Sequence, residues 1–185
     1  RKEAPSDFEF TLKAWQLITH PASSPTYRKA LLKILPGSED NYGFFRTSDE
    51  VRAAWEETMR IAEALGAKII VFQCPPSFKE TDENIKQMNK FFKQIRQSGF
   101  LFVWEPRADW KEETIRALCQ ELNLIHCVDP MEKESVCGQP SYFRLHGGPR
   151  YQHRFSQAEL KVLKSKVKDK EAYILFNNIN MYNLS

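Results

Sequence analysis

Short apolar runs alternate with amphipathic segments along most of this 185-residue chain. Near-continuous apolar runs, such as residues 68–74, are typical of parallel strands that are covered on both faces. Parallel strands need crossover connections, which are usually helices. The alternation therefore predicts an α/β fold with about six parallel strands, in one domain spanning residues 1–185. The predicted strands cover residues 8–14, 68–74, 100–105, 124–129, 142–147 and 172–178.

Helix signals lie between most of these runs. A short helix is expected near residues 27–35, and Thr81 is expected to begin a later one. Gly66 is expected to end the helix that precedes the second strand. Residues 130–140 leave no room for a crossover helix, so this link is predicted to be irregular. A capping-box pattern starts three further helices, at Thr47–Glu50, Asp109–Glu112 and Ser156–Glu159.

Composition indicates a globular protein without a membrane span. Hydrophobic residues make up 42% of the chain and charged residues 28%, and no apolar run approaches the roughly 18 residues of a spanning helix. The net charge of +3 is too small by itself to predict nucleic-acid binding. The four cysteines form no CxxC pair, and no signal-peptide pattern is present at this end, so we expect reduced thiols and a cytoplasmic protein. Because the first residue is Arg1, we expect the sequence to be a fragment.

Polar residues gather where the predicted strands end. In parallel sheets and (β/α)8 barrels, ligands bind at the carboxyl ends of the strands. We therefore expect a polar pocket there, with Trp110 as a wall. The residues at these ends are Lys13, Gln73, Glu105, Arg107, Asp129, Arg144, His146, Asn177 and Asn178.

The stretch YFRLHGG, residues 142–148, shows the pattern most clearly. On a strand, Arg144 and His146 share one face, whereas Phe143 and Leu145 share the other. A buried arginine needs a carboxylate or an anionic ligand. Glu105 could pair with an arginine in a structural network, contact a ligand, or do both. The two glycines that follow would let backbone N–H groups approach an anion.

Five motifs follow one another along the chain: ITHP, VFQCPPSF, WEPRADW, YFRLHG and LFNN. In this order they resemble the motifs of the domain-of-unknown-function 72 family, the YecE-like proteins. The resemblance implies a TIM-type (β/α) barrel with a pocket at the strand ends, and it implies no particular reaction. The matching residues are Lys13, His20, Gln73, Pro75, Pro76, Ser77, Phe78, Glu105, Arg107, Trp110, Arg144, His146, Gly147, Asn177 and Asn178.

The chain also departs from the family pattern. It lacks the family's first strand, with its GTSGW-like motif, the second strand that leads to an N-x-T-F-Y-like motif, and the last helix. Six strands cannot close an eight-stranded barrel, so we expect an incomplete one. Site residues carried by the family's first two strands have no counterpart here.

Three functional hypotheses follow. The first is an enzyme acting on a small polar or anionic ligand, of the sugar or phosphate type, with Glu105 and His146 as acid and base. The second is nucleic-acid binding or processing, because residues 149–155 interleave basic and aromatic side chains. The third is a binding module without turnover. The ligand-binding residues expected for the first are Lys13, Gln73, Arg107, Trp110, Arg144, Gly147, Asn177 and Asn178.

No metal site is expected. A metal would have to be held by Glu105, Asp129 and His146, which come from separate strands, and the sequence has no HxH, HExxH or paired-cysteine motif. The pattern identifies no cofactor and no oligomeric state.

Overall fold

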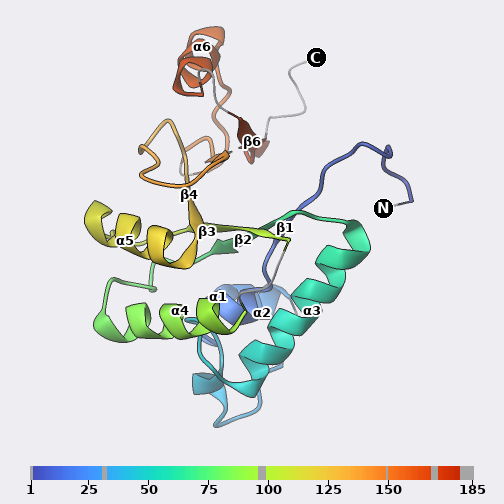
Figure 1. Ribbon diagram of the computed structural model, residues 1–185, viewed down its shortest axis with the longest axis vertical. Coiled ribbons are helices and arrows are strands. Elements are labelled where there is room, and N and C mark those ends of the chain that lie inside the picture. Colours follow the sequence, from blue (N-terminus) through green and yellow to red (C-terminus); the bar gives the residue numbers. More distant parts are fainter. Residues whose placement is uncertain (1, 31–32, 96–98, 149, 168–170, 180–185) are drawn as a thin grey trace. The chain divides into compact units, whose positions relative to one another are not determined.

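The fold is α/β with six parallel strands, as the computed structural model shows (Figure 1). The chain divides into two compact units, residues 1–114 and residues 115–185. The predicted single domain stays a prediction. The structure describes residues 2–30, 33–95, 99–148, 150–167 and 171–179.

The first unit contains a three-stranded parallel sheet in the order β1-β2-β3. Since side chains alternate across a strand, the register assigns residues to two faces. Gln73 lies beside Glu105 on one face, and Phe72 lies beside Trp104 on the other. The strands are β1 (Thr11–Lys13), β2 (Ile69–Gln73) and β3 (Leu101–Glu105).

Aromatic side chains fill the face of this sheet that carries Phe72. The Phe72 ring, which is fully buried, lies 4.9 Å from the Phe92 ring and 5.6 Å from the Phe102 ring, measured between centroids. It also contacts the rings of Phe45, Trp55 and Phe91. Residues of α3 and α4 contribute to this cluster, so these helices cover one face of the sheet and leave the Gln73 face to other groups.

The helices of the first unit begin and end close to the predicted positions. Gly66 ends α3 in the left-handed conformation, with φ 66°, and the Thr81 side chain caps α4, as predicted. The cap of α3 is Ser48 rather than Thr47, because the Ser48 hydroxyl accepts the Val51 N–H. The helices are α1 (Gln16–Thr19), α2 (Pro25–Lys29), the 3-10 helix η1 (Glu39–Asn41), α3 (Asp49–Leu65) and α4 (Asp82–Gln94).

The second unit contains a parallel sheet in the order β4-β5-β6, and its β4–β5 link has no helix, as predicted. Ser156 and Glu159 form the predicted capping box at the start of α6. Helix α5 begins at the end of the first unit and continues into the second. The elements are α5 (Glu112–Leu122), β4 (Leu124–Val128), β5 (Ser141–Leu145), α6 (Gln157–Lys166) and β6 (Ala172–Phe176).

The two faces of β5 differ as the sequence predicts. Leu145 packs in an apolar cluster with Phe155 and Leu163, next to Phe176. The other face has Tyr142, whose ring stacks on that of Tyr173 at 5.9 Å. Arg144 lies on this second face by alternation. The apolar core therefore lies on one side of this sheet and the predicted polar residues on the other.

Other predicted boundaries are also wrong, at the first strand, at α2 and at α5. The first strand begins at Thr11 rather than Phe8; the Phe8 side chain is 53% exposed, and its ring packs against that of Phe10. Helix α2 ends at Lys29, well before residue 35, and residues 31–32 of that prediction lie outside the described residues. Asp109 is not at the N-cap position predicted for it, because α5 begins at Glu112.

A carboxylate distant in sequence, that of Glu80, accepts hydrogen bonds at the start of α5. Glu80 Oε2 accepts the Lys111 N–H at 2.7 Å, and Glu80 Oε1 accepts from the Thr114 hydroxyl at 2.8 Å. These bonds lower the pKa of Glu80 below its ordinary value. A sequence pattern limited to four residues cannot detect such a contact.

Among the residues that the structure describes, no helix is both long and apolar enough to cross a membrane.

Candidate functional site

The carboxyl ends of the first unit's strands carry an ion pair. Glu105 is buried at the end of β3, beside Gln73 of β2. Arg107 Nη2 lies 2.8 Å from Glu105 Oε1. Because a buried carboxylate is costly unless it is paired, Arg107 explains how Glu105 is tolerated there. Lys13 lies exposed at the end of β1.

Trp110 lies in the interior of the first unit. Its ring packs edge-to-face on Trp104, with centroids 5.1 Å apart, and against Phe78 at 5.5 Å. Its indole N–H donates to the Phe78 carbonyl at 2.9 Å. These contacts are those of a core residue, whereas its role as a pocket wall stays a prediction.

Arg144 and Asn177 meet at the ends of β5 and β6 in the second unit. With the Asn177 amide oriented so that its oxygen faces the guanidinium, Oδ1 accepts from Arg144 Nε at 3.0 Å and from Nη2 at 2.7 Å. Both residues are half-buried. The two adjacent strands thus present a guanidinium and an amide side by side, on the face opposite the apolar cluster.

Asp129 fixes the backbone at His146. Its Oδ2 accepts the His146 N–H at 2.8 Å, and its Oδ1 accepts the Met131 N–H at 3.0 Å. The His146 ring, in a residue that is 7% exposed, packs edge-to-face on Tyr151. Both carboxylate oxygens of Asp129 therefore have structural roles. Across the described ranges, no three His, Cys, Asp or Glu residues form a group that could hold a metal ion.

Asn178 holds the loop that follows β5 against the end of β6. Its Nδ2 donates to the His153 carbonyl at 2.9 Å, and a Cβ at Gly147 would lie 2.8 Å from the Asn178 Cβ. Gly147 has φ 70°, so the close approach and the backbone conformation both favour glycine. Asn178 Oδ1 is buried and has no hydrogen-bond partner within the described part of the chain. It could accept a hydrogen bond from a hydroxyl or an amino group.

His20 is a buried polar residue that the predicted site omits, although it lies in the ITHP motif. It is 5% exposed, and its Nδ1 lies 2.8 Å from the Thr19 hydroxyl oxygen. Burial, together with the charge of Lys13, lowers the pKa of His20 to about 4. A neutral imidazole near a strand-end lysine is a candidate acid–base group. The ITHP motif contains this histidine, but a single isolated histidine in a sequence is weak evidence for a functional role.

The backbone beside His20 has an uncommon conformation. Gly43, Phe44 and Phe45 all have positive φ, of 76°, 52° and 56°. Their N–H groups donate to carbonyls of α1, which holds this conformation in place. Non-glycine residues with positive φ are concentrated at functional sites. Phe44 and Phe45 therefore indicate, as His20 does, that this part of the first unit could be functional.

The buried histidines His20 and His126 are expected to make the folded protein less stable in acid. The pKa of His126, like that of His20, is lowered to about 4, mainly by burial, and His126 Nδ1 accepts the Val136 N–H at 3.2 Å. Each folded-state pKa lies below the unfolded value, so the stabilisation is complete above pH 6.5 and is lost as pH falls towards 4. We expect His126 to contribute on the order of 2 kcal/mol to this loss.

Urea unfolding at pH 7 and at pH 5 measures this effect. His126→Gln should show a smaller decrease in the free energy of unfolding between the two pH values than the wild type. Equal decreases in the wild type and His126→Gln would contradict the prediction.

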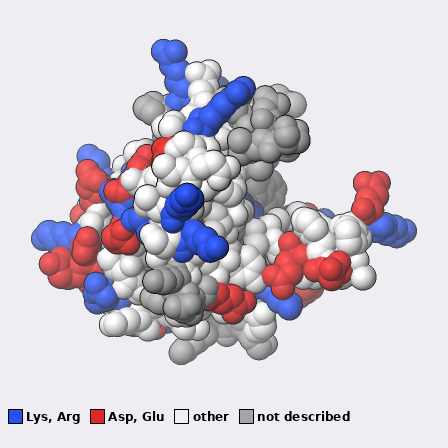
Figure 2. Space-filling view, turned by 90° about the horizontal axis from the view of Figure 1, so that it is seen from above, with Lys and Arg blue, Asp and Glu red and all other residues white. Residues whose placement is uncertain are grey.

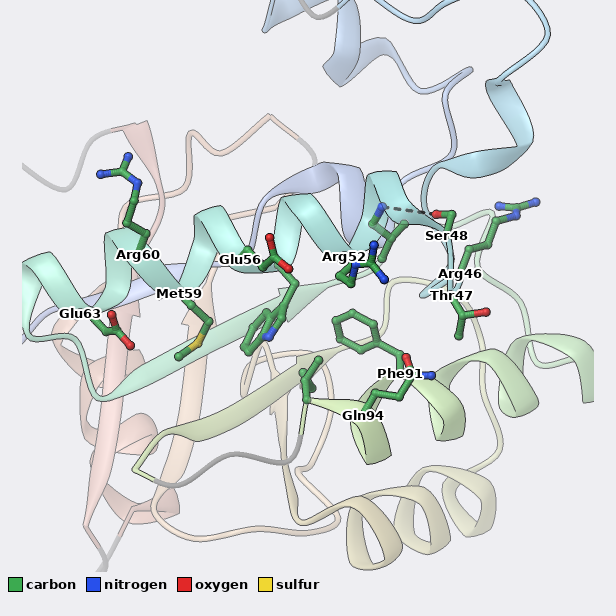
Figure 3. Close-up of a pocket in the computed structure, with 13 residues that line it drawn as sticks. Arg46, Thr47, Ser48, Arg52, Glu56, Met59, Arg60, Glu63, Phe91 and Gln94 are labelled. Carbon is green, nitrogen blue, oxygen red and sulfur yellow. Dashed lines mark hydrogen bonds between the residues drawn. The ribbon is translucent and has the colours of Figure 1, made fainter.

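A hollow of about 620 Å³ lies between α3 and α4 (Figure 3). Its lining combines apolar side chains, including Met59 and Phe91, with arginines. Two of these arginines pair within α3, Arg52 with Asp49 at 2.9 Å and Arg60 with Glu57 at 2.6 Å. None of the predicted site residues lines it. A second hollow, of about 280 Å³, includes Lys13 and lies where β1 meets α3.

Comparison with known proteins supports the family resemblance. The family model described as "Protein of unknown function DUF72" matches residues 1–183. No curated protein sequence matches the chain. A DUF72 family protein of Thermotoga maritima is similar in structure, with a TM-score of 0.65 and 23% identity over 96% of this chain and 70% of that chain. A DUF72 family protein of Enterococcus faecalis gives a TM-score of 0.62 and 18% identity, over 94% and 69%. These two structural similarities show the fold of the chain. They confirm the prediction of an α/β fold of the TIM-barrel type.

Proposed function

The chain belongs to the DUF72 family, and we propose that it is an enzyme acting on a small polar or anionic ligand, of the sugar or phosphate type, at the carboxyl ends of its strands. The observation that carries the proposal is the contact between Arg144 and Asn177. A guanidinium binds carboxylate or phosphate oxygens in pairs, and an amide exchanges hydrogen bonds with hydroxyls. Their position at strand ends is the usual place for ligands in this architecture.

The proposed roles follow from the chemistry of each side chain. In the second unit, Arg144 binds negative charge, His146 transfers protons, and the backbone at Gly147 lies close to the ligand. In the first unit, Glu105 transfers protons while Arg107 and Lys13 attract anions. The proposed hydrogen-bonding partners of ligand hydroxyls are Gln73, Asn177 and Asn178. We also propose a cytoplasmic setting, in which the four free cysteines would be reduced in the absence of an added oxidant such as peroxide.

Nucleic-acid binding is the second candidate. It is supported by Tyr151, which is 43% exposed, and by the exposed Arg150 and Arg154. Phe155, however, is buried in the apolar cluster and cannot stack on a base, and Pro149 lies outside the described residues. Figure 2 shows acidic as well as basic side chains among the described residues, and the net charge of the chain is only +3. These observations favour the small ligand.

Thermal unfolding against a ligand panel tests the proposal. The panel contains sugar acids, sugar phosphates, divalent metals and short single-stranded DNA, each at low and moderate salt. We expect one small anion to raise the Tm by several degrees, with little effect of salt. Arg144→Ala should remove the shift. Arg52→Ala, which changes an exposed arginine on α3, should keep it.

Other outcomes would count against the proposal. A shift produced by DNA alone that fades with salt would support the second candidate, because nucleic-acid binding releases counterions. An anion shift that is equal in Arg144→Ala and the wild type would remove Arg144 from the site.

A further inference from the structure

A pair of thiols in the second unit lies outside the proposed site. Cys119 is buried on α5, and Cys137 is half-exposed in the link between β4 and β5. The two thiols lie within hydrogen-bonding reach of each other, and each shifts the pKa of the other. They are 18 residues apart in the sequence (137 − 119), so the fold rather than a local sequence motif brings them together.

Hydrogen bonds fix the backbone around both thiols. Arg116, one turn before Cys119, donates to the Val136 carbonyl at 2.8 Å. The His126 N–H donates to the Cys137 carbonyl at 3.0 Å. The link is therefore tied both to α5 and to β4 at the position of Cys137. Because both segments are anchored, the two thiols keep the same position relative to each other, and a disulfide bond requires a specific geometry.

The surroundings make the two thiols chemically different. The interaction with Cys119 and the nearby charge of Arg116 hold the pKa of Cys137 below its ordinary value, whereas the interaction with Cys137 and burial raise the pKa of Cys119. The thiolate is the nucleophilic form, and access governs oxidation. Charge and exposure thus both single out Cys137 as the thiol that reacts first.

We propose that Cys137 and Cys119 form a peroxide-sensitive pair, in which Cys137 is oxidised first and Cys119 converts it to an intramolecular disulfide. The Cys137 thiolate attacks an oxygen of a hydroperoxide, the O–O bond breaks, and the departing oxygen takes up a proton as an alcohol or water. Cys137 is then a sulfenic acid. The Cys119 sulfur attacks the Cys137 sulfur, the S–O bond breaks, and the hydroxyl leaves as water with the Cys119 proton.

This reaction is balanced. Two thiols and one hydroperoxide give one disulfide, one alcohol (or water) and one water. The thiols lose two electrons, and the O–O bond accepts them. The disulfide would link α5 to the segment that leads into β5.

The other two cysteines provide internal controls. Cys74 is fully buried, its sulfur accepts from the Trp104 indole N–H at 3.3 Å, and burial raises the pKa of its thiol. Cys127 is buried in β4. Both should therefore remain reduced while the pair reacts.

The test uses the full chain, treated with a small excess of hydrogen peroxide, alkylated, and mapped by mass spectrometry without reduction. We expect a disulfide between the peptides of Cys119 and Cys137, reversed by dithiothreitol, with Cys74 and Cys127 still alkylated. In Cys119→Ser, dimedone should trap a sulfenic acid on Cys137. Cys137→Ser should consume peroxide about tenfold more slowly than the wild type.

Three results would overturn the proposal: disulfides only between separate chains, a first oxidation at Cys119, or oxidation of Cys74 as fast as that of Cys137. Non-reducing electrophoresis of the wild-type chain, and mapping after brief peroxide exposure with dimedone present, distinguish these results even if one of the serine variants fails to fold.

Discussion

Replacing Phe72 with alanine should lower the free energy of unfolding of the first unit by about 3–5 kcal/mol. The ring is fully buried and contacts five other aromatic rings, so its removal leaves a cavity that these rigid neighbours cannot fill. Urea unfolding followed by tryptophan fluorescence measures the change, since Trp55 and Trp104 lie in this unit.

Phe8→Ala is the matched control. It removes the same side chain from a position that is 53% exposed, and it should change the free energy of unfolding by about 0.5 kcal/mol or less. If both substitutions had the same effect, the aromatic cluster would not be the stabilising core of this unit.

Gly43→Ala should be similarly harmful, with a cost of roughly 3 kcal/mol or more. A Cβ there would lie 2.1 Å from the His20 carbonyl oxygen, which is backbone and cannot rotate away. The residue also has φ 76°, which disfavours any side chain. The expected result is a large drop in Tm or failure to fold, measured by circular dichroism.

Gly66→Ala separates the effect of the positive φ from that of the close contact with a neighbouring backbone. Gly66 has φ 66° as well, but a Cβ at this position would meet nothing within 4 Å. Its substitution should therefore cost only about 1 kcal/mol, from the backbone conformation alone. Equal costs at Gly43 and Gly66 would mean that the His20 backbone moves aside, which would contradict the close packing described above.

Much of the fold could be predicted because its signals are local. The alternation of apolar runs gave the six strands, and short capping patterns marked where α4 and α6 begin. The errors have non-local causes. The start of α5 depends on hydrogen bonds to Glu80, which lies about 30 residues earlier in the sequence. The length of β1 depends on which of its residues pair with β2.

The candidate site was predicted less completely. Strand periodicity correctly assigned Arg144 and Leu145 to opposite faces, because alternation requires no knowledge of neighbours. The partners of the polar residues could not be deduced in this way. Within the first unit Glu105 pairs with Arg107, and within the second unit Arg144 bonds to Asn177. The contact between Cys119 and Cys137 likewise leaves no trace in sequence spacing.

The central claim is that a small anion binds where the parallel strands end. The most direct measurement is a titration of ¹⁵N-labelled protein with the anion that shifts the Tm, followed in amide NMR spectra. We predict saturable shifts at Gly147, Asn177 and the Arg144 side-chain N–H. Shifts confined to Arg46, Arg52 and Arg60, around the hollow between α3 and α4, would contradict the account.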